Sequence, residues 1–391
     1  MDDPLRQQPR IVELDALRGL AVIGIAWMNV YVYALPQQAY YNPAAYGAES
    51  GLDYAVWAGS FVFIENKFRT IFALLFGTGI AIMWGRDGGW SGHLARMAVL
   101  FAIGIVHATL LASNDILRVY ALAGLVLPLF LRLDWNGLVL AAVAAMALHL
   151  LGGYVWLSRQ PEAFFALNYG ADPAGLANAL AIGREDIGAR IARRIGLLPG
   201  SLVTVAAAIP ANLTAMLAGV ALWRSGASPA LWSRHRARAL VIVCLLIGWP
   251  TVALVALSTC LLGFDPAGVA RNALLVSVPF SMLMGFAYAV GALALFGSHA
   301  GSRWVRLLAS VGRLSLTNYL MTSVIFAALF ADWGLGLFAQ LPRSQVFALS
   351  FIPGLAMLAW SAQWLRHFDK GPAETAWRWM AKALARDRRD G

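Results

Sequence analysis

Charged side chains are scarce in this sequence. Only 13% of its 391 residues are Asp, Glu, Lys or Arg, whereas 60% are hydrophobic. An ordinary soluble protein carries about 25% charged residues, and a globule of this size could not cover its surface with roughly half that share. A disordered chain is excluded as well, because disorder requires low hydrophobicity. Since a membrane-spanning helix needs ~20 mainly apolar residues, the composition predicts an all-α, polytopic membrane protein.

Cysteines and the common site motifs are also few. The two cysteines, Cys244 and Cys260, lie in one apolar run, where a helix would separate them by ~24 Å, beyond disulfide reach. No His-Glu-x-x-His, Gly-x-Ser-x-Gly or Gly-Lys-Ser pattern occurs in the chain. The sequence therefore predicts no disulfide, no bound metal and none of the usual nucleophile or phosphate-binding motifs.

The apolar runs set the expected number and direction of the membrane spans. Lys and Arg are more numerous in the loops on the N-terminal side of the membrane, so the positive-inside rule places both termini in the cytoplasm. The net charge of +10 is assigned to these topogenic residues, and no nucleic-acid partner is expected. About ten spans are predicted, near residues 12–35, 61–85, 94–112, 116–132, 137–158, 197–223, 238–262, 270–296, 305–330 and 344–365.

Two segments outside the spans have amphipathic character. Within residues 159–195, Asp172-Pro173 is a strong helix start, and apolar residues then recur at helical spacing between arginines. We expect a helix on the outer membrane surface there, and a second interfacial helix in the cytoplasmic tail, with membrane lipids as partners. The expected organisation is one transmembrane domain over 1–391, divided into helices one to five (1–158), outer loop (159–195), remaining helices (196–366) and tail (367–391).

Ionisable residues inside the predicted spans indicate internal ion pairs or a polar cavity, because a charge in the bilayer costs at least ~2.5–3.5 kcal/mol. In the first span, Asp15 and Arg18 are three residues apart near the cytoplasmic boundary and can pair. This pair is either a structural boundary pair or part of a site. Asn29 lies deeper and is either a helix–helix contact or a substrate ligand.

Three charges stand close together at the start of the second predicted span. Glu65 and Arg69 are four residues apart and can pair within a helix, whereas Lys67 points elsewhere and needs another partner or water. A snorkelling cluster at the outer headgroup level would explain all three without a binding site.

His107 in the third predicted span is suited to general acid–base chemistry, because imidazole takes and gives a proton near neutral pH. The alternative is a histidine that only packs against a neighbouring carbonyl. Asp115 could cap a helix beginning at Ile116. A continuous helix would place Asp115 ~12 Å from His107, so contact between the two requires the chain to turn at Ser113.

On this topology, polar residues of the first three spans reach one level in the outer half of the membrane. Their common depth predicts a hydrated cavity that faces the extracytoplasmic side and holds a base, two cations and two carboxylates. Asn318 and Tyr319 in the ninth predicted span are further candidate substrate ligands, although interhelical hydrogen bonding would also explain them.

Six stretches of the chain form a recognisable set. They are Leu-Asp-Ala-Leu-Arg-Gly-Leu-Ala at 14–21, Asn-Lys-Phe-Arg-Thr-Ile-Phe-Ala-Leu-Leu-Phe-Gly at 66–77, His107 with Asp-Ile-Leu at 115–117 and Tyr120, Gly-Arg-Leu-Ser-Leu-Thr-Asn-Tyr-Leu at 312–320, Gly-Leu-Gly-Leu-Phe at 334–338 and Gly-Pro-Ala-Glu-Thr-Ala-Trp-Arg at 371–378. Together they resemble the YeiB-like family of bacterial inner-membrane proteins, a domain of unknown function. The resemblance runs in order over nearly the whole chain and implies a bacterial inner-membrane location.

The Asp-x-x-Arg-Gly pattern at 15–19 also resembles the wider transmembrane acyltransferase superfamily, which includes the heparan glucosaminide acetyltransferase. Its members pass an acyl group from cytoplasmic acyl-CoA to an acceptor on the far side of the membrane. The resemblance implies acyl-CoA as co-substrate and, by analogy alone, a homodimer. The heparan enzyme's catalytic His lies in the first non-cytoplasmic segment, whereas residues 36–60 contain no His here, so His107 would have to take its place.

The expected function is therefore an acyltransferase embedded in the membrane. His107 would act as general base, Asp115 or Glu65 would orient it, and Lys67 or Arg69 would stabilise the oxyanion. Two alternatives use the same residues. One is a transporter of a small anionic or lipidic solute with the two cations as counter-charges, and the other is a non-catalytic lipid-binding protein whose charges are satisfied internally.

Overall fold

The computed structural model describes residues 11–84, 89–225 and 234–390, and it forms helices and no strands within them. The helices are, in chain order, α1 (Val12–Ala34), η2 (Gln37–Tyr40), α2 (Gly51–Phe63), α3 (Lys67–Met83), α4 (Trp90–Leu110), α5 (Leu117–Val126), η3 (Leu127–Phe130), α6 (Trp135–Ser158), α7 (Glu162–Tyr169), α8 (Pro173–Gly183), α9 (Ile187–Arg224), α10 (Arg234–Leu261), α11 (Pro266–Arg271), η4 (Asn272–Val276), α12 (Ser277–Ser298), α13 (Arg303–Arg313), α14 (Ser315–Phe330), α15 (Arg343–Leu349), α16 (Phe351–Trp364) and α17 (Pro372–Asp390).

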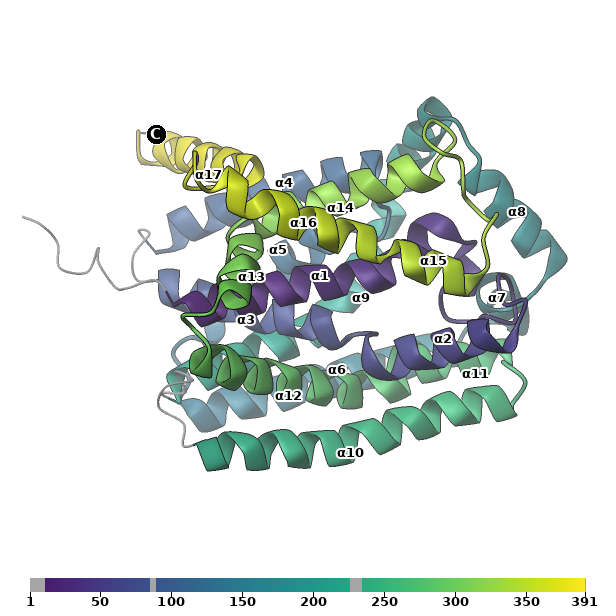
Figure 1. The fold of residues 1–391 in the computed structure, drawn as a ribbon, viewed down its shortest axis with the longest axis horizontal. Coiled ribbons are helices and arrows are strands. Elements are labelled where there is room, and N and C mark those ends of the chain that lie inside the picture. The colour runs from purple at the N-terminus through teal and green to yellow at the C-terminus, as the bar shows by residue number, and fades with distance from the viewer. Residues whose placement is uncertain (1–10, 85–88, 226–233, 391) are drawn as a thin grey trace, which may run out of the picture.

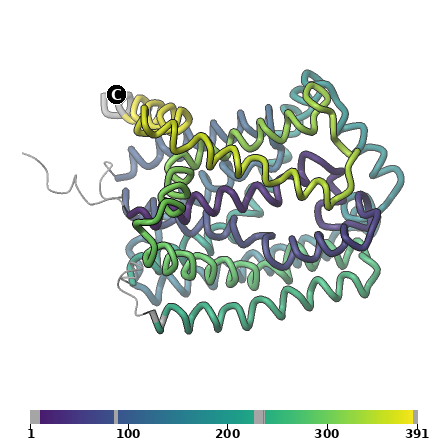
Figure 2. The backbone as a smooth tube through the Cα atoms, viewed as in Figure 1, coloured from purple at the N-terminus to yellow at the C-terminus, as the bar shows by residue number. Residues whose placement is uncertain are grey.

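The long helices run side by side in one bundle (Figure 1). The start of α1 and the end of α17 lie at the same end of this bundle, here called the terminal end (Figures 1 and 2). The short helices α7, α8 and α11 lie at the opposite end, here called the far end (Figure 1).

Seven segments of the described chain are long and apolar enough to cross a membrane, or eight if α13 and α14 count as one span bent by 81°. The chain is therefore a polytopic α-helical membrane protein, as its composition predicts, but the expected number of ten spans is wrong. The seven segments are α1, α4, α6, α9, Ala237–Leu261 of α10, Pro266–Ser298 and Arg343–Trp364.

Two of the predicted spans, 61–85 and 116–132, do not form single long helices. In the first, Asn66 adopts a left-handed conformation (φ 65°), which separates α2 from the 17-residue α3. The second forms a shorter apolar segment, Leu117–Phe130. Most residues of α3 and α5 are buried inside the bundle. Their hydrophobicity therefore reflects packing in the core, which a hydropathy pattern does not distinguish from contact with lipid.

The predicted outer loop, 159–195, is shorter than expected. The helix start at Asp172 is confirmed, since its side chain accepts a hydrogen bond from the Gly175 N–H at 2.8 Å and caps α8. The amphipathic helix does not continue to residue 195, because Asp186 caps a new helix through the Ala189 N–H at 2.9 Å. This new helix, α9, runs on for 38 residues, so the arginines expected on the membrane surface form its first turns.

α1 and α13 are in close contact. Gly19 and Gly312 lie at their crossing, and a Cβ on Gly312 would be 1.8 Å from the Asp15 carbonyl oxygen. Only residues without a side chain allow two backbones to approach so closely. The predicted span 305–330 is not one straight helix, because it bends by 81° between α13 and α14. Leu314 at the bend and residues 316–318 in the first turn of α14 are buried.

The tail forms the predicted helix, α17, and one side of it docks on the bundle. The Trp377 indole N–H donates to the Arg96 carbonyl of α4 at 3.0 Å. Glu374 Oε1 accepts hydrogen bonds from the backbone N–H groups of Leu316 (2.7 Å) and Thr317 (3.2 Å). These two groups lie in the first turn of α14, where no carbonyl of the same helix can accept them. Glu374 thus caps α14 from another helix.

Candidate functional site

His107 and Asp115 meet in the interior of the bundle. α4 ends at Leu110, and the next residues reverse direction before α5 begins, so the turn required near Ser113 is present. The reversal brings Asp115 Oδ1 to 2.8 Å from His107 Nδ1. Both side chains are buried, each residue being 3% exposed. The aspartate that the sequence also explained as a helix cap is therefore the direct partner of the histidine.

Asp115 also caps α5 and accepts a hydrogen bond from α14. Its Oδ2 accepts the backbone N–H of Arg118 at 3.0 Å, and the Arg118 guanidinium lies 3.8 Å from the same oxygen. Its Oδ1 accepts the Tyr319 hydroxyl at 3.3 Å. The two functions proposed for Asp115, helix capping and contact with the histidine, thus coexist on its two oxygens.

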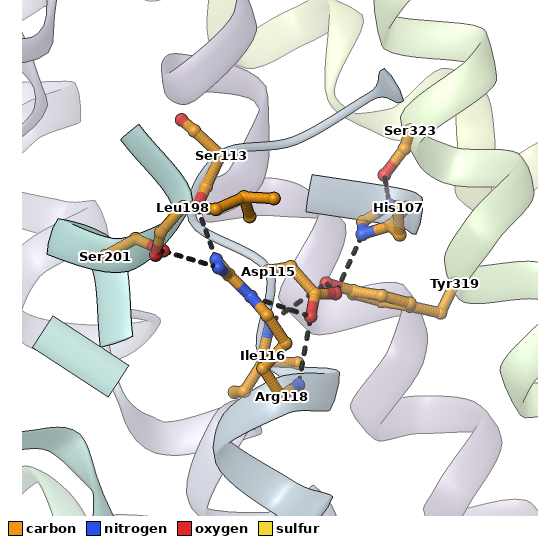
Figure 3. A network of polar contacts seen from close by, with 9 residues as sticks. All are labelled: His107, Ser113, Asp115, Ile116, Arg118, Leu198, Ser201, Tyr319 and Ser323. Carbon is orange, nitrogen blue, oxygen red and sulfur yellow. Dashed lines mark hydrogen bonds and ion pairs between the residues drawn. The ribbon is translucent and has the colours of Figure 1, made fainter. Parts of the chain in front are cut away.

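The contact with Asp115 indicates which ring nitrogen of His107 carries a proton. The oxygens of a carboxylate can only accept, as Asp115 does from the Arg118 N–H and the Tyr319 hydroxyl, so Nδ1 of His107 carries the proton directed at Oδ1. The opposite nitrogen, Nε2, then presents a lone pair. It lies 2.8 Å from the Ser323 hydroxyl of α14, which points toward it (Figure 3). Ser323, His107 and Asp115 form a hydrogen-bonded chain in the order used by serine-type acyl-transfer enzymes.

Arg118 is fixed on the other side of the network. Its guanidinium donates to the Ser201 hydroxyl of α9 at 2.9 Å and to the Ser113 carbonyl at 2.8 Å (Figure 3). The guanidinium supplies a positive charge next to Asp115 and joins α5 to α9. A buried carboxylate is stable only with such partners.

A second polar network surrounds the break between α2 and α3. Glu65 accepts hydrogen bonds from the hydroxyls of Tyr40 (3.0 Å) and Tyr41 (3.4 Å). Burial raises the pKa of both phenols well above the usual value, and the charge of Glu65 raises it further, so both keep their protons and donate. Arg69 donates to the Asn66 side chain and is exposed, although the neighbouring residues are buried.

The expected pairing of Glu65 with Arg69 within one helix does not occur among the described residues. The left-handed residue Asn66 separates the two side chains, and each has other partners. Lys67 is fully buried, and its Nζ donates to the Phe61 carbonyl at 2.8 Å and to the Ser281 hydroxyl at 3.1 Å. None of the three charged residues contacts His107 in the described chain, so Asp115 and not Glu65 orients the histidine.

The remaining predicted site residues, Asp15, Arg18, Asn29 and Asn318, lie elsewhere in the bundle. Asp15 and Arg18 form the predicted ion pair at 3.1 Å. Asn29 is half-buried in α1 and lies outside both networks. Asn318 is fully buried, donates to the Val311 carbonyl at 3.0 Å and accepts the Trp360 indole N–H at 3.0 Å. These contacts join helices, which is the alternative to substrate binding that the sequence left open.

Two residues of the network, Ser323 and Arg118, were not predicted from the sequence. Ser323 follows Tyr319 by four residues, so both lie on one face of α14, and that spacing was the available signal. Arg118 follows Asp115 by three residues, and its position in an apolar run was a further signal.

The interior around His107 is closed in this structure. Ser323, like the other two members of the chain of hydrogen bonds, is 3% exposed. A cavity of about 350 Å³ lies instead beside the end of α3 and the start of α4, lined by Trp84, Trp90, Arg132, Arg224 and neighbouring apolar residues.

The fold and the network define a polytopic helical membrane protein with a buried Ser–His–Asp arrangement. The chain belongs to the YeiB family: it is 31% identical to the uncharacterized protein YeiB of Escherichia coli K12, over 96% of this chain and 97% of the relative. It is also 27% identical to the uncharacterized protein YxaH of Bacillus subtilis, over 96% and 95% of the two chains.

Two family models match different parts of the chain. Residues 222–383 match the model described as protein of unknown function (DUF418). Residues 10–169 match the model described as heparan-alpha-glucosaminide N-acetyltransferase, catalytic. No solved structure matches this chain.

Proposed function

We propose that this protein is a membrane-embedded acyltransferase of the bacterial inner membrane, with both termini in the cytoplasm. It moves an acyl group from acyl-CoA, which approaches from the terminal end, to an acceptor hydroxyl or amine on the other side. The observation that carries the proposal is the geometry of His107, with Nδ1 at 2.8 Å from Asp115 and Nε2 at 2.8 Å from a hydroxyl group.

This geometry suits general base catalysis. Asp115 holds the ring in the tautomer whose Nε2 can take a proton, and it stabilises the imidazolium that forms. The catalytic acetyltransferase model spans residues 10–169 and so contains both His107 and Asp115. The match and the geometry both favour acyl transfer.

The contacts disfavour a non-catalytic protein. Such a protein would hold His107 by backbone carbonyls and pair Glu65 with Arg69. In the described chain His107 contacts two side chains instead, one acidic and one nucleophilic in type. Glu65 is hydrogen-bonded to two phenols rather than to Arg69.

The test is a transfer assay on purified protein in lipid nanodiscs, with labelled acetyl-CoA and longer acyl-CoAs. Asp115→Asn removes the charge that orients the base, and His107→Ala removes the base. We expect each to lower CoA release by about 10²–10⁴-fold, which is the usual contribution of a general base.

His93 is the matched control. It is a fully buried histidine on the same helix, and in the described chain its Nε2 hydrogen-bonds to a backbone group, the Gly124 carbonyl, at 2.9 Å. His93→Gln should keep the transfer rate within about threefold of the parent, because a residue away from the chemistry does not stabilise the transition state. Equal CoA release by the parent protein and His107→Ala would refute the proposed function.

A further inference from the structure

Ser323 is more than a neighbour of the base. Its hydroxyl is the hydrogen-bond partner of His107 Nε2, which is the nitrogen left free to accept a proton. An external acceptor that gave its proton to this nitrogen would first have to displace Ser323. The side chain already in place to lose a proton to His107 is therefore the serine of the protein itself.

Two buried donor atoms without hydrogen-bond partners lie in the region where α1 and α9 approach the His107 network. The Tyr33 hydroxyl of α1 and Nε of Arg194 of α9 are both buried and make no hydrogen bond within the described chain. The ring of Tyr33 lies 5.6 Å from that of Phe326, one turn beyond Ser323 on α14. Ser323 and Arg194 both lie close enough to influence the Tyr33 hydroxyl.

Arg194 reaches the same region from α9. Its NH1 group donates to the Thr109 carbonyl at 3.4 Å, two residues beyond His107. A buried donor that lacks an acceptor is unfavourable, and it requires an explanation such as a ligand that is absent. Two such donors in the region of Ser323 and His107 match the needs of a tetrahedral oxyanion.

Resting on the proposed function, we propose that Ser323 is the nucleophile and carries the acyl group as an ester, with Tyr33 and Arg194 as oxyanion donors. Ser323 Oγ gives its proton to His107 Nε2 and forms a bond to the thioester carbonyl carbon. The C–S bond then breaks, and His107 returns the proton to the CoA thiolate. In the second half, His107 takes the proton of the acceptor, the acceptor bonds to the acyl carbon, the ester C–O bond breaks, and Ser323 regains its proton.

The alternative role for Ser323 is that of a positioning residue that holds the imidazole. Exchange of labelled CoA into acyl-CoA, measured without any acceptor, distinguishes the two roles. Exchange requires that the acyl group leave CoA and stay on the protein. We expect exchange with the parent protein, and loss of more than about 10³-fold in Ser323→Ala, since its nucleophile is missing.

Thr322→Ala is the matched control. Thr322 is the preceding residue of α14, is equally buried, and its hydroxyl donates only to the Asn318 carbonyl at 2.9 Å. It should retain the parent's exchange. Peptide mass mapping after incubation with acyl-CoA should place the added acyl mass on the peptide with Ser323.

Tyr33→Phe tests the oxyanion donors, because it keeps the ring packed on Phe326 and removes only the hydroxyl. We expect exchange to fall by about 10²–10³-fold, the usual cost of losing one oxyanion donor.

Two results separate this inference from the proposed function. Transfer by the parent protein without CoA exchange, or exchange that persists in Ser323→Ala, would overturn the acyl-serine and leave the acyltransferase intact. Absence of both transfer and exchange would overturn both.

Discussion

Gly104 lies one helical turn before His107 on α4, and the space left by its missing side chain is filled by the loop that carries Asp115. A Cβ at this position would lie 2.7 Å from Asp115 Oδ2, 2.8 Å from Arg118 Cγ and 2.9 Å from the Arg118 backbone nitrogen. Atoms do not approach so closely, so Gly104→Ala must push the start of α5 away from α4.

The size of this displacement decides the outcome. Ordinary contact with a Cβ begins at 3.4 Å, so the neighbours must move by about 0.5–0.7 Å. A shift of this size lengthens the 2.8 Å contact between His107 and Asp115 beyond the usual range for a hydrogen bond. Misplacement on the order of 1 Å can cost about 10² in rate. We therefore expect transfer to fall by about 10²-fold.

The stability cost can be measured against a second glycine. Gly79 is half-buried in α3, and a Cβ there would meet nothing within 4 Å. Gly79→Ala should be neutral or stabilising by up to about 1 kcal/mol, because alanine favours helix. Gly104→Ala should lie below it by ~1–3 kcal/mol, the cost of overpacking.

The assay is thermal unfolding and transfer for both variants in the same nanodiscs. An unchanged melting temperature and an unchanged rate for Gly104→Ala would refute the geometry on which the site is built. A fall in both for Gly79→Ala would show instead that these helices do not tolerate alanine in general.

Three further predictions concern the surroundings of the site. Tyr319→Phe removes the long hydrogen bond to Asp115, worth about 0.5–1.5 kcal/mol, so transfer should fall by about tenfold or less. It also removes the acceptor of the Ile116 N–H at 3.4 Å, so a small fall in melting temperature is expected. Glu374→Ala removes the cap of α14 and should lower stability by about 0.5–2 kcal/mol in thermal unfolding. Asp53→Asn should destabilise the protein in a pH-dependent way: burial raises the pKa of Asp53, but hydrogen bonds from Ser344 outweigh burial and hold the pKa well below its usual value. Its stabilising effect is complete above the unfolded pKa of about 3.9 and is lost as the pH falls through the folded pKa, so the melting temperatures of parent and variant should converge only in acid.

Each of these has a contrary outcome. A loss of 10²-fold or more in Tyr319→Phe would make the hydroxyl part of the chemistry rather than a weak support. Lys382, which is exposed on α17, gives the control for the cap, and an equal loss of stability in Lys382→Ala and Glu374→Ala would contradict the capping contact. A difference between Asp53→Asn and parent that grows on acidification would reverse the sign of the argument.

Much of the helical architecture could be predicted from composition and apolar runs, whereas the count of spans could not. Hydropathy measures how apolar a segment is, not what it faces. The segment around Leu117 is apolar because it lies in the core, and it is too short to cross a membrane. The break at Asn66 depends on one left-handed residue, which has no hydropathy signature.

The candidate site, too, could be predicted only in part. The pair of Asp15 with Arg18, and the turn that brings Asp115 to His107, follow from local spacing. Ser323 comes from a helix 216 residues further along the chain, and its contact depends on how α14 packs. The network around Asp115 and the network around Glu65 are also separate. Depth along the membrane could not predict this, because residues at one depth can face different helices.

The contact of Glu374 with α14 has a consequence for folding during synthesis. A chain is synthesised from its N-terminus, so α14 is made before α17 exists. Until that last helix has folded against α4, the first amides of α14 have no acceptor from the carboxylate that later binds them. The helix that presents Ser323 to His107 is thus capped only after residues 372–390 have folded. Removal of residues 372–391 would leave the first turn of α14 without this cap, although no residue of the Ser323, His107 and Asp115 network is lost.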